Sequence, residues 1–137
     1  MSGVPESRRT LSSYEFYANA LAIRVEVTKL TTGPSVPKSY RFVFSVPMAS
    51  TARALVDHLT RADAYYPNSL ENAVERKKML TEAVADCRMI MQDLQCLREV
   101  CDQVKASRFE RIAEMVGREI ALVKGVRKNV HVMGRRQ

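Results

Sequence analysis

Few side chains in this sequence could bind a metal ion or act as a nucleophile, and those few stand apart from one another. Neither His58 nor His131 has another ligand residue three or four positions away. Cys87, Cys96 and Cys101 follow one another at intervals of nine and five residues, which is unlike the short paired spacing of a zinc site. We therefore expect histidines at the surface or at the edge of the core, no metal ion and no cofactor.

Acidic residues in the expected third helix raise a second question, because helical bundles can hold pairs of metal ions between carboxylates. The residues concerned are Glu75, Glu82, Asp86 and Asp93. The Glu-x-x-His pairs of such sites are missing, and Lys78 and Arg88 lie close enough for ordinary ion pairs along a helix. We expect a solvated face here. Since there is also no phosphate-binding glycine loop and no nucleophile beside a base, the sequence predicts no catalytic residue and a protein that is not an enzyme.

Basic residues remain, and they gather at the end of the chain. The net charge is +7, and residues 105–137 hold nine Lys or Arg and three Glu, which accounts for +6. Such a cluster binds polyanions by charge and releases counterions. Two partners stay open, a nucleic acid and an acidic protein. Binding to a membrane surface is disfavoured, because the basic face lacks bulky apolar residues beside it.

A helical wheel separates the basic residues of the last helix from its apolar ones. The half opposite the apolar residues holds Arg111, Arg118, Lys124 and Lys128, with Arg127 at the border. The segment from Arg76 to Lys78 is a second basic patch that could extend this surface. We expect nucleic-acid or partner contacts on these residues.

Gly117, Ala121 and Gly125 form a line of small residues within the same basic half. A glycine inside a helix costs about 1 kcal/mol relative to alanine, so two on one line need a reason. Close approach of another backbone is one, either a helix of a neighbouring subunit or a nucleic-acid strand. The other is a helix that tolerates two glycines on its solvent side.

The elements that must position these residues are helices. Composition (46% apolar and 27% charged over 137 residues) is that of a single globular domain. Apolar periodicity predicts an all-α, antiparallel up-down four-helix bundle over residues 11–133, which we expect to form a homo-oligomer. The first ten residues are expected to be disordered and residues 134–137 to form a flexible basic tail. The expected helices span 12–30, 38–66 (kinked near Pro47), 69–104 and 108–131.

Helix starts are predicted from capping boxes, and helix faces from apolar spacing. The predicted boxes are Ser12 with Glu15, Asn68 with Glu71, and Ser107 with Glu110. The second helix is expected to turn Phe42 and Val46 to the core. The third carries a heptad-like seam in which cysteine acts as a small apolar residue. The seam residues are Leu80, Ala83, Cys87, Ile90, Leu94, Leu97, Cys101 and Val104.

No segment reaches the roughly 18 apolar residues of a membrane span, and the first ten residues lack the apolar region of a signal peptide. An odd number of cysteines fits reduced thiols. We therefore expect a cytoplasmic protein.

Several segments resemble one known family. They are RFVFSVPMASTAR (41–53), RADAYYPNSLENAVERKKML (61–80), DLQCL (93–97) and EIALVKGVRKNV (119–130). In order and character they are similar to the accessory variability determinant (Avd) proteins, which are encoded beside the reverse transcriptases of diversity-generating retroelements in bacteria and their phages. Four-helix bundle proteins encoded by ribosomal-RNA intervening sequences are a competing match.

The resemblance to the Avd family implies a non-catalytic partner of a reverse transcriptase. Members form a homopentameric barrel with a basic surface, bind the enzyme and nucleic acid, and support error-prone cDNA synthesis from a template-repeat RNA. Contact with RNA or polymerase then falls on Lys124, Arg127 and Lys128, which match the family's basic C-terminal stretch, and extends to Arg76, Lys77 and Lys78. A basic face that meets an acidic protein and no RNA remains the alternative.

Overall fold

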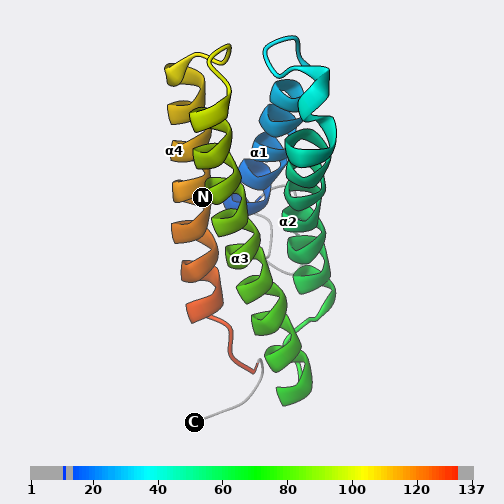
Figure 1. The fold of residues 1–137 in the computed structure, drawn as a ribbon. Helices are drawn as coiled ribbons and strands as arrows, with labels where there is room; N and C mark the ends of the chain where they lie inside the picture. The colour runs from blue at the N-terminus through cyan, green and yellow to red at the C-terminus, as the bar shows by residue number, and fades with distance from the viewer. Residues whose placement is uncertain (1–10, 12–13, 133–137) are drawn as a thin grey trace.

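Four α-helices make up most of the chain in the computed structural model, which describes residue 11 and residues 14–132. They pack lengthwise around one core (Figure 1). No strand occurs in these residues, so the prediction of an all-α four-helix bundle is confirmed. The expectations for residues 1–10 and 134–137 concern residues outside those described. The helices are α1 (Glu15–Thr32), α2 (Val46–Ala64), α3 (Leu70–Val100) and α4 (Ala106–Lys128).

The core follows the apolar seam of α3, as predicted. From Leu80 to Leu97 each residue of the seam is at most 3% exposed. Cys101 and Val104 are also buried, but they lie beyond the helix, which ends when the Cys101 N–H donates to the carbonyl of Leu97. Burying a side chain of this size contributes about 1.5–3 kcal/mol, so α3 fixes how α2 and α4 lie along it.

The chain before α2 is helical but not α-helical. A 3-10 turn (Lys38–Tyr40) leads into a π-helical segment (Arg41–Ser45), in which the Val46 N–H donates to the carbonyl of Arg41. Pro47 follows in the first turn of α2 and has no N–H to donate to a carbonyl of the π-helical segment before it. Near Pro47, where a kink was predicted, the structure shows a change of helix type.

This change of helix type makes one core prediction wrong. Phe42 is 82% exposed and Val46 is 48% exposed. A π-turn holds one residue more than an α-turn, so it alters which side chains face inward. Tyr40 and Phe44 pack against the core instead, with their ring centroids 6.0 Å apart.

The cap of α3 is Ser69 and not the predicted Asn68. Ser69 Oγ accepts a hydrogen bond from the Asn72 N–H at 3.2 Å. Asn68 Oδ1 accepts one from the Asn72 side chain at 3.1 Å, which supports the same turn. Glu71 therefore lies in the first turn of the helix without completing a capping box.

The predicted capping box of Ser107 with Glu110 is not found either. At α4 the N-cap residue is Lys105 and no side chain caps the helix, so Ser107 lies inside it. At α1 the N-cap residue is Tyr14, again without a side-chain cap. Ser12, the expected cap there, lies outside the described residues. None of the helices in the described part of the chain is long and apolar enough to cross a bilayer.

We expect Ser69→Ala to lower the free energy of unfolding by about 1 kcal/mol, because the acceptor for the Asn72 N–H is lost. Ser107→Ala is the matched control, since Ser107 is exposed and caps nothing. Urea unfolding followed by circular dichroism gives both values. Equal effects of the two substitutions would show that Ser69 is not the cap.

Candidate nucleic-acid interface

Two basic segments that are far apart in the sequence meet between α3 and α4. Arg127, in the last turn of α4, donates from Nη1 to Thr81 Oγ1 at 3.2 Å, across 46 residues of chain. Figure 1 shows the last turns of α4 beside the first half of α3. We call the cations gathered here the basic surface. It consists of Lys77, Lys78, Lys124, Arg127 and Lys128.

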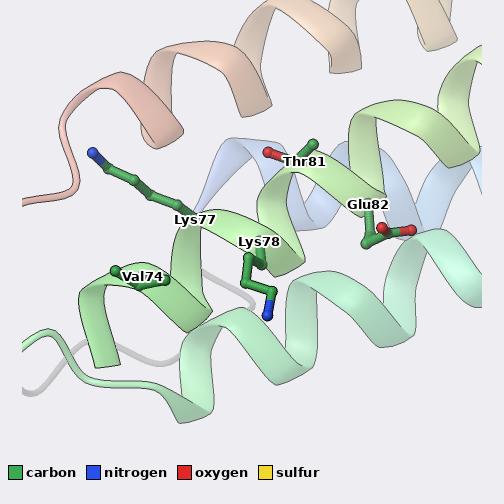
Figure 2. Close-up of a pocket in the computed structure, with 5 residues that line it drawn as sticks. All are labelled: Val74, Lys77, Lys78, Thr81 and Glu82. Carbon is green, nitrogen blue, oxygen red and sulfur yellow. The ribbon is translucent and has the colours of Figure 1, made fainter. Parts of the chain in front are cut away.

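The α3 part of the basic surface surrounds a shallow depression (Figure 2). Its lining residues are Val74, Lys77, Lys78, Thr81 and Glu82. Lys77 and Thr81 project to the side of α3 where α4 lies, whereas Lys78 projects toward α2. The two lysines therefore present their charges on both sides of one helix.

Most cations of the basic surface are free to meet an external anion. Lys77, Lys124 and Lys128 are exposed and form no ion pair within the described residues. Lys78 contacts Glu75 at 3.4 Å, but its side chain is 63% exposed. An exposed pair of this kind contributes at most about 1 kcal/mol, so a phosphate can displace it.

Two further predicted contact residues, Arg76 and Arg118, also have partners within the chain. Arg76 is half-buried, and its Nη1 donates to the carbonyl of Tyr65 at 3.2 Å. This bond ties the loop after α2 to α3. Arg118 forms an ion pair with Glu15 of α1, so its charge is already balanced.

Arg111 is balanced in the same way as Arg118. It contacts Glu26 of α1 at 2.5 Å. Glu15 and Glu26 of α1 thus pair with two of the three cations in the first two-thirds of α4, while Arg108 forms no ion pair among the described residues. The last turns add Lys124, Arg127 and Lys128, which form no ion pair within the same residues.

The line of small residues lies on the outer face of α4, as the wheel placed it. Gly117, Ala121 and Gly125 are exposed. A Cβ atom built on Gly117 or Gly125 would meet no atom within 4 Å. Packing inside the described chain therefore requires neither glycine.

Glu119 is a residue whose position the sequence reasoning missed. It is 0% exposed, and Asn19 Nδ2 donates to its Oε1 at 3.0 Å. Its Oε2 has no hydrogen-bond partner among the described residues. Burial raises the pKa of Glu119 to about 7, against the lowering effects of Asn19 and Arg118. The sequence did contain a signal for this burial. Glu119 is three residues after Val116 and four before Val123, which places it on the core face of α4.

Asp86 corrects a second expectation, that the acidic residues of α3 form a solvated face. It is 6% exposed, and its Oδ2 lies 2.6 Å from His58 Nδ1 of α2. Burial raises the pKa of Asp86, while the hydrogen bond and charge of His58 lower it. The pair links α2 to α3. No group of three metal-ligating side chains occurs in the residues the structure covers.

The cysteines lie where core packing predicts. Cys87 and Cys101 are buried and Cys96 is exposed, all as free thiols. Burial, with Glu119 and Asp86 nearby, raises the pKa of Cys87 to about 12. A thiol with such a pKa is a poor nucleophile at neutral pH.

We expect the stability of the protein to fall as the pH rises from about 4.5 to about 7, because in this range Glu119 ionises in the unfolded chain but stays neutral in the core. Its folded pKa lies above its ordinary value of 4.5, so its contribution is complete below pH 4.5 and is lost above about 7. The loss amounts to about 3 kcal/mol. Glu119→Gln should flatten this part of the profile, and Glu114→Gln, at an exposed position of α4, should not. Urea midpoints measured between pH 5 and 9 test this. If they change with pH by the same amount in the wild type, Glu119→Gln and Glu114→Gln, Glu119 is not the group responsible.

Comparison with protein-family models, with curated proteins and with solved structures finds no match for this chain. The role of the basic surface therefore has to be inferred from its own side chains.

Proposed function

We propose that this chain is a non-catalytic accessory protein of a diversity-generating retroelement. In this role it binds a reverse transcriptase and template RNA or cDNA and supports mutagenic cDNA synthesis in the cytoplasm of a bacterium. The resemblance to the Avd family supplies the identity of the partners. The observation that carries the nucleic-acid part is the contact of Arg127 with Thr81, which joins two basic segments into one surface.

Charge supplies the binding mechanism in this proposal. Five cations at one end of α3 and α4 can neutralise phosphates and release the counterions that these phosphates hold. Arginine adds directional hydrogen bonds to phosphate, since its guanidinium presents several donors in one plane. Base edges need not be read, so this surface recognises a phosphate backbone and not a sequence.

In this proposal the chain holds RNA against the polymerase and does no chemistry itself. The polymerase contact is assigned to the same segments, because the resemblance places both contacts there. Every chemical step of cDNA synthesis then belongs to the partner enzyme.

The proposal includes an antiparallel up-down topology and assembly of several copies, five by resemblance. Two ion pairs support the topology, since Glu15 pairs with Arg118 whereas the later Glu26 pairs with the earlier Arg111. Positions thus increase along α1 as they decrease along α4. The exposed line from Gly117 to Gly125 supports the assembly, because a flat outer face lets a helix of another copy approach.

We expect the purified protein to bind a structured RNA with an affinity that falls steeply as salt rises. Each neutralised phosphate contributes roughly 0.9 to the log-log slope on a duplex. Lys124→Glu/Arg127→Glu/Lys128→Glu should reduce the slope by about 3 and weaken binding at all salt concentrations. Fluorescence anisotropy over a salt series measures both quantities.

The matched control is Lys29→Glu/Arg61→Glu/Arg88→Glu, which reverses three exposed cations away from the last turns of α4. Both variants lower the net charge from +7 by two for each of three reversals, to +1. If the control loses as much affinity as the test variant, binding follows net charge and the basic surface is not a site. If the wild type binds no RNA, the acidic-protein alternative takes its place.

Substitution of the two glycines tests the proposed contact between copies. We expect Gly117→Ala/Gly125→Ala to raise the thermal midpoint of the dissociated chain, because alanine favours a helix by about 1 kcal/mol over glycine. The added methyl groups should at the same time weaken the assembly by holding the backbones apart. Sedimentation velocity over a concentration series measures the second effect, with Gln92→Ala on the exposed face of α3 as control. An assembly that is unchanged, while the helix is stabilised, would remove the glycines from the contact.

A further inference from the structure

The π-helical segment before α2 presents an exposed aromatic side chain. Phe42 is 82% exposed and its neighbour Val43 is 67% exposed. In Figure 1 this segment, coloured cyan, lies at the opposite end of the bundle from the last turns of α4. Phe42 is not part of the basic surface, and its side chain does not pack in the core.

The structure around Phe42 holds its side chain outward. The Tyr40 hydroxyl donates to the carbonyl of Val100 at 2.8 Å, which fixes the 3-10 turn against the end of α3. The Tyr40 and Phe44 rings pack together on the core, with centroids 6.0 Å apart. Tyr40 and Phe44, two positions before and after Phe42, both point toward the core. Phe42 lies between them on the opposite side of the helical backbone, so its side chain points to solvent. Its ring is therefore presented on an ordered support.

The stretch of chain that carries Phe42 is positively charged. Lys38 and Arg41 are exposed and form no ion pair among the residues described. Residues 38–56 contain no Asp or Glu. The third cation of this stretch, Arg53, is held by Asp57 at 3.6 Å. A ring flanked by two free cations complements a ligand that offers an apolar face together with negative charge.

We propose that Phe42 stacks on an unpaired base of single-stranded nucleic acid, while Arg41 and Lys38 neutralise the adjoining phosphates. Bases offer flat apolar faces, and phosphates recur along the same strand, so one ligand satisfies the ring and the cations together. A duplex cannot do so, since its bases are stacked on one another. The inference rests on the proposed nucleic-acid function and adds a substrate class to it, namely single strands.

The test compares a labelled 20-nucleotide oligouridine with a 20-base-pair RNA duplex, both measured by fluorescence anisotropy on the full chain. Phe42→Ala should weaken binding of the single strand by about 5- to 150-fold, the range measured for loss of one base–aromatic stack. Binding of the duplex should not change. Phe42→Trp should restore binding of the single strand, because it restores a ring. Phe42→Leu should not, because it keeps apolar bulk without one.

Val25→Ala is the matched control, since Val25 is 50% exposed on α1. Thermal melting checks that each variant is folded. We expect folding to be unaffected, because Phe42 and Val25 are both exposed. If Phe42→Leu binds the single strand as well as the wild type, stacking is overturned and the segment is an apolar docking site for a protein. If Phe42→Ala weakens both ligands equally, selectivity for single strands is overturned.

The outcomes also separate this inference from the proposed function. Reversal of Lys124, Arg127 and Lys128 should weaken duplex binding and leave the ratio between the affinities of wild type and Phe42→Ala for the single strand unchanged. If the protein binds the duplex and Phe42→Ala binds the single strand as well as the wild type does, only the present inference is overturned. No binding of either ligand overturns both.

Discussion

Burial of the α3 seam is the constraint on which the rest of the molecule depends. The helix is 31 residues long, and its apolar positions recur every three or four residues through most of that length. Such a seam can be covered only by helices that lie along it. When α4 returns along α3, its last turns come beside the first half of α3, and Arg127 reaches Thr81. Apolar packing between the helices, and not any interaction among the cations, therefore assembles the basic surface.

Buried and exposed charges are handled differently in this bundle. On the surface, Glu15 and Glu26 of α1 form ion pairs with two arginines of α4, whereas the cations in the last turns of α4 form none among the described residues. In the interior, Asp86 has His58 as a partner, whereas one oxygen of Glu119 has none among the described residues. An unpaired carboxylate is costly to ionise away from water. The interior thus holds Glu119 neutral up to about pH 7 and makes stability depend on pH.

Sequence periodicity predicted the long helices and most of the core, because the seam from Leu80 to Leu97 repeats at helical spacing. Helix ends were predicted less well, since Asn68 and Ser69 are both good caps and only the turn geometry selects between them. Phe42 was predicted to face the core from the spacing of an α-helix, but it lies in a π-helical segment, where that spacing does not apply. The basic residues of the candidate site were predicted, but their partners were not. Arg118 and Glu15 lie 103 residues apart, and only the packing of α1 on α4 brings them together.

In the proposed function, residues 74–82 and 121–128 form one nucleic-acid surface. Amide hydrogen exchange of the full chain, with and without a saturating structured RNA, tests this directly because it reports each segment separately. We expect slower exchange in both segments, and we expect this protection to be lost from both together when the salt is raised enough to release the RNA. Protection of only one segment, or of neither while RNA remains bound, would contradict it.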